Sequence, residues 1–365
     1  MTASSLVDLV NKIHCSDVMA FTKQLPDESI HVIMTSPPYW GLRDYGSSTE
    51  AIWCGAWRGQ LGLEPHPSLY IQHLVAVCRE LRRVLRKDGS MYLVLGDTYY
   101  GSVTGRSKSD LGSSSEQLTN KGFFSCDDAK GLVHREPLSN WLTPKQKLMI
   151  PARVAIALQE DGWILRNEIT WYKSNAMPES VRDRLTEKTE RIYHFVKNRK
   201  YYFDLDAIRQ PHQYDGRKQT KYLGGPHDKS IGPHERWPKP LGKNPGDVYK
   251  SESGQYAIGG RHSGYFNEDG FHPDGANPGD FWSINTKPFK DAHFAVFPED
   301  LCVMPIKAAC PPDGIVLDPF CGSGTTCLVA AKLNRRWIGV DINRDYCEMA
   351  RNRLADFMVK LDEFG

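Results

Sequence analysis

The sequence has no Cys-x-x-Cys pair, no apolar run long enough to cross a membrane and no strong excess of either charge. Its nine cysteines are scattered along the chain, which favours free thiols in a reducing compartment over a disulfide framework or a zinc site. No stretch approaches the roughly 18 apolar residues of a membrane helix, and no basic segment followed by an apolar one opens the chain. We therefore expect a cytoplasmic protein with no membrane partner.

The charge balance is nearly even. A formal net charge of only +2 arises from 46 Lys and Arg against 44 Asp and Glu. Any nucleic-acid surface must therefore come from local clustering of basic residues, because the bulk charge supplies little attraction. With 365 residues, 40% of them hydrophobic, the chain can bury a large core. One large domain with insertions, or two domains, is expected.

Most of the chain alternates between strand-like and helix-like patterns. Apolar residues follow helical spacing from Ser68 to Lys87, Gly89 is expected to end this helix, and MYLVLGD (91–97) predicts a buried strand. The C-terminal part repeats the pattern, with strands predicted at GIVLDPF and RWIGVDI and helices after each. This alternation predicts an α/β fold.

Two segments interrupt the alternation. Residues of about 100–140 are rich in Ser and Gly without an apolar period, which predicts a flexible loop. Residues 211–285 are rich in Gly, Pro, His, Lys and Asn and poor in aliphatic residues, which predicts a loop-rich insert. We therefore divide the chain into residues 1–210, the insert 211–285, and residues 286–365.

The most specific local pattern is VLDPFCGSGTT (316–326), followed after a helix by RRWIGVDIN (335–343). A strand, a glycine turn, a helix and a second strand ending in an acid form the first unit of a nucleotide-binding α/β fold. Gly322 and Gly324 allow a ligand to approach the backbone, and Asp341 is placed to bind a ribose diol. The alternative is an ordinary tight turn between a strand and a helix.

Features that are absent from the glycine turn exclude some classes of ligand. No lysine follows the glycines, so the turn is not a triphosphate P-loop, and the spacing departs from GxGxxG. Asp318 disfavours an anionic ligand and suits a cationic one. S-adenosylmethionine, with its sulfonium and ammonium groups, meets these demands.

A second motif lies in HVIMTSPPYWGLRDYG (31–46). Here a predicted strand ends at Ser36 and runs into Pro37 and Pro38, which carry no N–H and leave their carbonyls free to accept hydrogen bonds. Tyr39 follows with an aromatic face. Alone, these letters also fit a proline-terminated edge strand.

Together, TSPPY, DPFCGSGTT and WIGVDIN resemble the amino-group DNA methyltransferases, whose catalytic motif is (S/N/D)PP(Y/F/W). The catalytic motif precedes the glycine turn, which resembles the circularly permuted β group. The resemblance covers nearly the whole chain and weakens only in 100–140 and 211–285. It implies a Rossmann-like methyltransferase fold that uses S-adenosylmethionine, with a mixed, mostly parallel seven-stranded sheet and helices on both faces.

The resemblance also implies site residues. Catalytic roles fall on Ser36, Pro37, Pro38 and Tyr39. Cofactor contacts fall in and beside the two motifs, after the first strand and in HFAVFPEDL (293–301): Asp17, Thr35, Phe294, Phe297, Pro298, Asp318, Pro319, Phe320, Gly322, Ser323, Gly324, Thr325, Thr326, Asp341 and Ile342. DNA contacts fall on Trp40, Arg43, Lys173, Asn175, Arg182 and Arg184. No metal is expected.

These assignments have alternatives. Core packing explains the aromatic positions about as well, an ion pair with Asp44 explains Arg43, and a solvated charged face explains the residues of 173–184. The chain also has Thr189–Glu190 where this family usually shows His-Glu.

Methylation of an exocyclic amine is a direct displacement, in which hydrogen-bond acceptors around the N–H groups stabilise the developing charge. The amine is paired inside the duplex, so the base must be flipped out. The chain contains no Pro-Cys dipeptide, which separates it from covalent cytosine-C5 methylation. Because SPPY is more typical of cytosine-N4 enzymes and DPPY of adenine-N6 enzymes, we predict N4 methylation of cytosine in double-stranded DNA, with N6 methylation of adenine as the alternative.

Other classes are weaker alternatives: an RNA or protein amine methyltransferase, and a DNA-binding relic without activity. The insert 211–285 is predicted to recognise the target sequence, because its Arg, Lys, Asn and His side chains can bind base edges. The resemblance implies a prokaryotic or phage protein of restriction–modification type, located at the nucleoid through DNA. A homodimer and a cognate restriction endonuclease are both left open.

Overall fold

The structure is a computed structural model. It describes residues 6–53, 57–100, 142–211, 248–250, 256–258, 272, 274–287 and 297–364. The loop predicted at about 100–140, most of the insert predicted at 211–285, and Phe294 lie outside the described residues. The chain divides into two compact units, one comprising Met1–Asp204 with Gly279–Gly365 and the other Leu205–Pro278.

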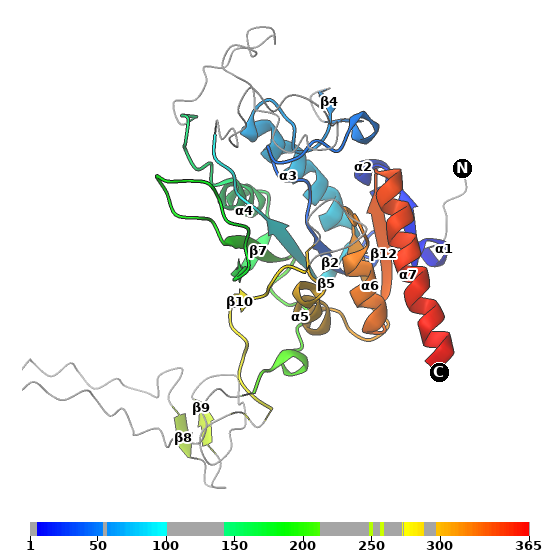
Figure 1. The fold of residues 1–365 in the computed structure, drawn as a ribbon. Helices are drawn as coiled ribbons and strands as arrows, with labels where there is room; N and C mark the ends of the chain where they lie inside the picture. The colour runs from blue at the N-terminus through cyan, green and yellow to red at the C-terminus, as the bar shows by residue number, and fades with distance from the viewer. Residues whose placement is uncertain are drawn as a thin grey trace, which may run out of the picture. The chain divides into compact units, whose positions relative to one another are not determined.

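The larger unit is built on one eight-stranded sheet (Figure 1). From edge to edge, its strands are β1 (Lys12–Cys15), β12 (Arg336–Asp341), β11 (Ile315–Asp318), β2 (Ile30–Thr35), β5 (Leu85–Leu95), β7 (Thr189–Val196), β6 (Ile164–Tyr172) and β10 (Phe281–Ser283). Neighbouring strands are parallel except at β7, which is antiparallel to both β5 and β6. The predicted mixed, mostly parallel α/β fold is confirmed.

The predicted number of seven strands was wrong, because β10 adds an eighth. This three-residue strand pairs with β6 in parallel, and Trp282 lies opposite Trp171. Pairing with β6 leaves Trp282 only 7% exposed. A strand this short has no periodicity of its own, and the burial of one large side chain against the sheet explains why it forms.

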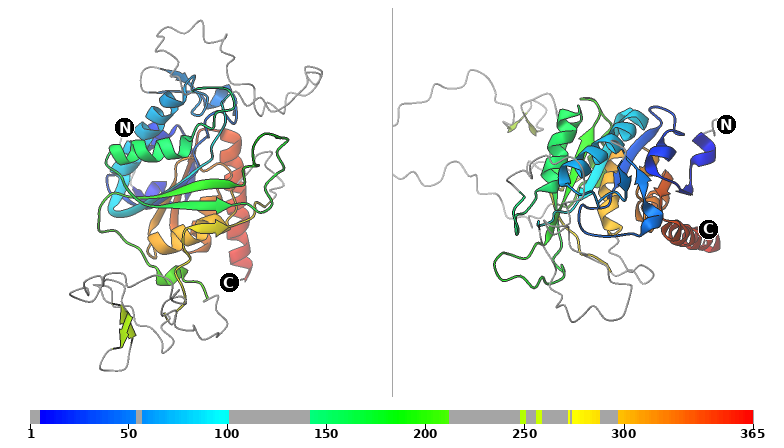
Figure 2. Two further views of the ribbon diagram at one scale, coloured as in Figure 1. Left: turned by 90° about the vertical axis from the view of Figure 1, so that its left-hand side faces the viewer. Right: turned by 90° about the horizontal axis from the view of Figure 1, so that it is seen from above.

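Helices cover both faces of the sheet (Figures 1 and 2). One face carries α1 (Leu6–Leu9), α2 (Val18–Thr22), α3 (Pro67–Val84) and α4 (Ile150–Glu160), and the other carries α5 (Asp300–Ala309), α6 (Thr325–Lys332) and α7 (Arg344–Phe364). Successive strand residues point to opposite faces, so Ile33 joins the first core while Val32 and Met34 join the second. Burial on both faces explains the continuous apolar runs of these strands.

The junction between α3 and β5 differs from the sequence-based expectation. The helix ends at Val84 and the strand begins at once with the buried Leu85, so Gly89 lies inside the strand and does not end the helix. A Cβ atom at Gly89 would lie 2.7 Å from the Leu85 side chain and 2.8 Å from the His31 carbonyl oxygen. Gly89 therefore serves close packing within the sheet.

The sheet brings the two sequence motifs together. Val316 and Leu317 of β11 pair in parallel with Val32 and Ile33 of β2. The carboxyl ends of both strands therefore lie at the same edge of the sheet. The ends of β1 and β12 lie there too. The carboxyl edge of an open α/β sheet is where ligands bind in such folds.

The remaining elements are short. The larger unit contains a two-stranded sheet of β3 (Ala51–Ile52) and β4 (Arg58–Gly59) and a 3₁₀ turn, η1 (Ser47–Thr49). The smaller unit contains β8 (Val248–Lys250), β9 (Tyr256–Ile258) and η5 (Asp206–Ile208). Within the described ranges, no helix has both the length and the apolar character that a membrane span requires.

Candidate active site

The carboxyl edge of the sheet encloses a cavity of about 300 Å³. This volume lies at the lower end of the range for small-molecule sites. Fifteen of the residues predicted from the sequence line it: Asp17, Ser36, Pro37, Pro38, Tyr39, Arg43, Lys173, Phe297, Pro319, Phe320, Gly322, Ser323, Thr325, Asp341 and Ile342. The catalytic and glycine motifs therefore share one cavity.

At one end of the cavity the backbone is open to a ligand. Gly322 has φ +50°, and a Cβ atom placed there would meet no atom within 4 Å. The Asp341 carboxylate is fixed beside it, accepting from the N–H of Gly322 (2.9 Å) and from that of Asn343 (2.8 Å). Burial raises the pKa of Asp341, and these two N–H groups oppose the shift. The open backbone and the fixed acceptor suit a nucleoside with free ribose hydroxyls.

Asp17 lies in the cavity wall and also caps a helix. Its Oδ1 accepts from the N–H of Ala20 (2.9 Å), which satisfies the first turn of α2. This bond fixes the carboxylate at the end of β1, beside the cavity.

Asp318 and Thr35, expected to contact a cofactor, lie behind the cavity wall. Both are fully buried, and the Thr35 hydroxyl donates to Asp318 Oδ1 at 2.7 Å. Asp318 Oδ1 also accepts from the N–H of Phe320 (3.1 Å), whereas Oδ2 is buried with no hydrogen-bond partner among the described residues. Burial raises the pKa of Asp318 to about 6, with the Thr35 hydroxyl opposing. The pair joins the ends of β2 and β11 from inside the protein.

Three more predicted cofactor residues do not line the cavity. Pro298 is buried away from it. Gly324 is required by packing, because a Cβ atom there would lie 2.9 Å from the Cβ of Ala350 on α7. The Thr326 hydroxyl donates to the Met34 carbonyl (3.3 Å), which again ties α6 to β2.

A chain of polar groups crosses the other end of the cavity. The Ser36 hydroxyl lies 3.1 Å from the Tyr39 hydroxyl, which lies 2.7 Å from Glu190 Oε2 on β7. Glu190 Oε1 pairs with the Lys173 ammonium, which sits 4.2 Å from the centre of the Trp171 ring. Burial and the nearby Glu190 raise the pKa of Tyr39 well above its usual value, so it stays protonated at neutral pH.

The direction of this chain follows from what each group can do. An ionised carboxylate only accepts, so Tyr39 donates to Glu190, and the Tyr39 oxygen can then accept from Ser36. The single proton of Ser36 is thereby directed at Tyr39. The lone pairs of Ser36 Oγ are left for a hydrogen-bond donor in the cavity, such as an N–H group.

Glu190 was not among the predicted site residues. It lies 151 positions from Tyr39, and only the antiparallel placement of β7 beside β5 brings it to the cavity. Its place in the Thr189–Glu190 pair, where the family usually shows His-Glu, was the one indication available from the sequence.

The two proline carbonyls differ. The Pro38 carbonyl already accepts from the Tyr70 hydroxyl (2.9 Å), whereas the described residues offer no hydrogen bond to the Pro37 carbonyl. Pro37 is therefore the better acceptor for a ligand.

A buried hydrogen-bonded pair of side chains supports the turn that follows. Glu64 accepts from His73 Nδ1 (2.9 Å) and from the N–H of Gly62 (2.8 Å), and the side chains of Glu64 and His73 are both fully buried. The Gly62 carbonyl in turn accepts from the N–H of Gly41 (2.8 Å). Trp40 donates its ring N–H to the Glu64 carbonyl (3.0 Å) and is only 3% exposed, so it packs in the core and presents no surface to DNA.

Of the other predicted DNA contacts, Arg43 and Lys173 line the cavity, whereas Asn175, Arg182 and Arg184 do not. The Asn175 amide donates to the Thr286 carbonyl (2.8 Å) and accepts from its N–H (3.1 Å), which holds two loops together. Arg184 pairs with Glu179 at 2.6 Å. Arg182 is exposed and has no ion pair within the described part of the chain. Lys173, in the cavity wall, is paired with Glu190.

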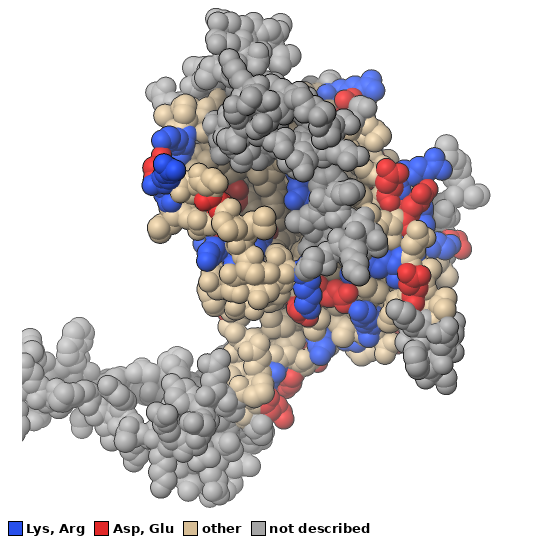
Figure 3. Space-filling view, viewed as in Figure 1, with Lys and Arg blue, Asp and Glu red and all other residues tan. Residues whose placement is uncertain are grey.

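Charged side chains on the face drawn in Figure 3 alternate in sign, and the described Lys and Arg residues form no single basic patch there.

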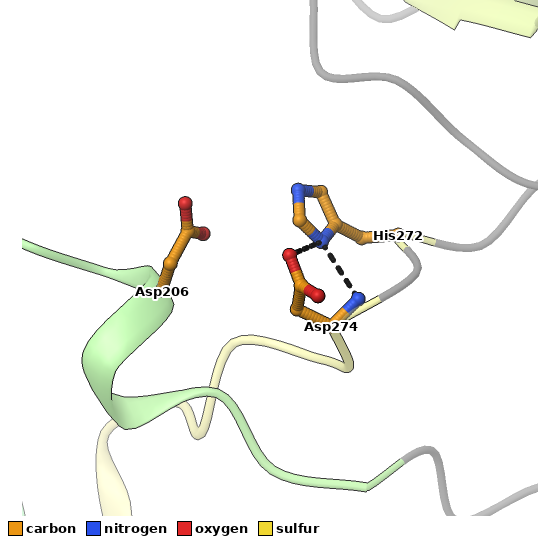
Figure 4. Close-up of side chains that lie close together, drawn as sticks. All are labelled: Asp206, His272 and Asp274. Carbon is orange, nitrogen blue, oxygen red and sulfur yellow. Dashed lines mark hydrogen bonds and ion pairs between the residues drawn. The ribbon is translucent and has the colours of Figure 1, made fainter.

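In the smaller unit, the ligand-type atoms of Asp206, His272 and Asp274 lie within 4.8 Å of one another (Figure 4). His272 Nδ1 accepts from the Asp274 N–H (3.2 Å), and Asp206 pairs with Arg209 (2.6 Å). These contacts within the protein explain why Asp206, His272 and Asp274 lie close together, and we assign no metal to them.

The fold is α/β, and its cavity lies at the carboxyl edge of the sheet, where ligands bind in such folds. Residues 30–352 match the profile of the DNA methylase family, which comprises N6 and N4 methyltransferases. The chain belongs to this family, whose members are S-adenosylmethionine-dependent methyltransferases, so the predicted family and cofactor are confirmed.

Similar proteins of comparable length are type II methyltransferases. The chain is 34% identical to the type II methyltransferase M.SmaI of Serratia marcescens, with 94% of this chain and 90% of the relative covered. It is 33% identical to M.SfiI of Streptomyces fimbriatus, covering 95% and 90%. The solved structure of the PvuII DNA methyltransferase, described as cytosine-N4-specific, has a similar fold, with a TM-score of 0.54, 17% identity and coverage of 93% and 84%.

Replacing Thr35 by valine should weaken the fold through Asp318. The hydroxyl stabilises the ionised carboxylate, so its loss should lower the free energy of unfolding by about 1.5–3 kcal/mol. The pKa of Asp318 is raised from 3.8 to about 6, so the carboxyl's own contribution to stability is complete below pH 3.8 and is lost as the pH rises through 6. The loss in Thr35→Val should therefore be larger at about pH 7.5 than at about pH 5, measured by urea unfolding.

Thr22→Val is the matched control. Thr22 is also buried, but its hydroxyl donates to the backbone carbonyl of Val18 (2.8 Å). Replacing Thr22 by valine should lower the free energy of unfolding by less, and by the same amount at both pH values. The same loss at both pH values in Thr35→Val would show that the Asp318 charge is not involved.

Replacing Gly96 by alanine should disturb the polar chain. A Cβ atom there would lie 2.5 Å from the Tyr39 ring, so the ring must move and its bond to Glu190 is lengthened. Overpacking of this kind costs about 1–3 kcal/mol. Methyl transfer should fall about tenfold or more, while S-adenosylmethionine binding by calorimetry stays unchanged. Normal turnover would contradict the role given to Tyr39.

Proposed function

We propose that this protein transfers a methyl group from S-adenosylmethionine to the N4 amine of cytosine in duplex DNA, after flipping the base into the cavity. The observation that carries the proposal is the neutral acceptor Ser36, whose proton is directed at Tyr39 and whose lone pairs are left for the cavity. A serine before Pro-Pro is more typical of cytosine-N4 enzymes. The described specificity of the PvuII enzyme, which shares the fold, agrees.

The cofactor is assigned to the end of the cavity that holds Gly322 and Asp341. S-adenosylmethionine, when bound, supplies a methyl group on a positively charged sulfur. Asp341 is placed to accept from the ribose hydroxyls, and Asp17 from the adenine amine. Phe297 and Phe320 line the same cavity and provide apolar surface for the nucleoside.

The amine is assigned to the Ser36 end. Ser36 Oγ and the Pro37 carbonyl accept its two hydrogens, which stabilises the positive charge that develops on nitrogen. The proton that the amine sheds after transfer then has a continuous path through Ser36 and Tyr39 to Glu190. Before that proton arrives, the pairing of Lys173 with Glu190 leaves neither charge unpaired in the cavity wall.

Base flipping is required because the amine is hydrogen-bonded inside the duplex. Unpairing and unstacking cost a few kcal/mol, which contacts in the cavity must offset. The Tyr39 ring lines the cavity and offers a stacking surface. We assign recognition of the target sequence to the insert 211–285 and much of the DNA backbone contact to exposed basic residues such as Arg182.

The product identifies the reaction. Unmethylated phage DNA should be incubated with the protein and S-adenosylmethionine, digested to nucleosides and analysed by mass spectrometry. We expect N4-methylcytosine, and sequencing of the same DNA should place it within one recurring sequence. N6-methyladenine alone would overturn the assignment of the base, and no methylated nucleoside would overturn the function.

Ser36→Ala tests the acceptor. Loss of one preorganised group that stabilises a transition state typically costs about 100-fold in rate, and we expect at least that loss with S-adenosylmethionine affinity unchanged. Ser29→Ala is the control, because Ser29 precedes the same strand at its amino end and its hydroxyl donates to the Pro26 carbonyl (2.7 Å). Activity retained in Ser36→Ala would exclude the mechanism.

A further inference from the structure

We propose that the loop between β6 and β7, residues 173–188, carries an apolar wedge of Met177 and Leu185 that enters the base stack where the flipped base has left it. The inference rests on the proposed function in one respect only, namely that a base leaves the duplex. It does not depend on which base is methylated.

The wedge residues are unusually exposed. Leu185 is 90% exposed and Met177 is 84% exposed, the two highest values among the large apolar side chains that the structure describes. Burying such a side chain against a partner stabilises the complex. A partner that covers both would therefore recover an amount of free energy similar to the cost of unstacking a base.

The loop is held in place by its charges. It projects beyond the ends of β6 and β7, as the green segment of Figures 1 and 2 shows. Three ion pairs fix it: Lys145–Asp183 (2.5 Å), Lys147–Glu187 (2.5 Å) and Arg184–Glu179 (2.6 Å). The Arg184 guanidinium also lies 4.0 Å from the centre of the Tyr99 ring. The apolar side chains are thus exposed on a braced loop.

The charge that remains suits DNA. The three acids of the loop, Glu179, Asp183 and Glu187, are all neutralised by these pairs. Arg182 and Lys188 are exposed and have no ionic partner within the described part of the chain. Two cations in the loop that carries the exposed apolar side chains match a phosphate backbone that flanks stacked bases, whereas an apolar protein surface would leave both cations without a counterpart.

The loop also lies at the right place. It starts at Lys173 and ends two residues before Glu190, and both of these residues line the cavity. Met177 is four residues from Lys173, so its backbone lies within about 14 Å of the cavity wall. A base that enters the cavity therefore leaves its gap within reach of the loop. Apolar side chains that enter base steps are a known way to hold a distorted duplex.

The experiment compares two duplexes that contain the target sequence found by sequencing. One is fully paired, and the other has an abasic site opposite the target base, so that extrusion costs little. In Met177→Ala/Leu185→Ala, kcat/KM should fall about tenfold or more on the paired duplex and should recover to within about threefold of the unsubstituted protein on the abasic duplex. 2-Aminopurine next to the target should show a smaller fluorescence rise in the variant.

Three controls guard the result. Val359→Ala removes an exposed apolar side chain on α7 and should leave both duplexes unaffected. Met177→Leu keeps an apolar tip and should retain activity. The methylated nucleoside formed by the unsubstituted protein is identified first. If it is N6-methyladenine, the proposed base assignment fails, but the paired and abasic duplexes can still be compared with adenine as the target base.

Three outcomes would overturn the wedge. The first is unchanged activity on the paired duplex. The second is an equal loss on both duplexes, which would mean that the two side chains act on folding or general DNA binding. The third is a change in oligomeric state by light scattering, which would assign Met177 and Leu185 to contacts between copies of the chain.

Discussion

The parallel pairing of β2 with β11 is the constraint on which the site depends. Each strand carries one motif at its carboxyl end, so their pairing places Ser36 and Gly322 in the walls of the same cavity. The buried bond between Thr35 and Asp318 locks the two ends together. A carboxylate buried in this way is costly, and its hydrogen bonds compensate only as long as both strands stay in register.

The two ends of the cavity then follow from different local rules. At the glycine turn, an open backbone beside a fixed carboxylate leaves room for a nucleoside. At the Pro-Pro turn, the polar groups are acceptors, because the prolines carry no N–H and the Ser36 proton is directed at Tyr39. The proposed ligands suit both ends, because the ribose hydroxyls of a nucleoside cofactor can donate to Asp341 and the N–H groups of a base amine can donate at the Pro-Pro turn.

The sequence predicted the order of elements and fifteen residues of the cavity, because glycine turns, proline pairs and apolar runs act locally. It could not separate residues that line the cavity from those one layer behind. Asp318 and Gly324 belong to the glycine motif as much as Asp341 and Gly322 do, and only packing against Thr35 and Ala350 distinguishes them. Glu190 and β10 were missed because each depends on contacts between distant strands.

The central claim is that the charge of Glu190 sets the direction of the chain to Ser36, and Glu190→Gln tests it most directly. A glutamine amide can donate to Tyr39, which would reverse the chain and direct a proton from Ser36 at the amine. Single-turnover methyl transfer to DNA should then slow about 100-fold while S-adenosylmethionine affinity stays unchanged. A rate equal to that of the unsubstituted protein would contradict the account.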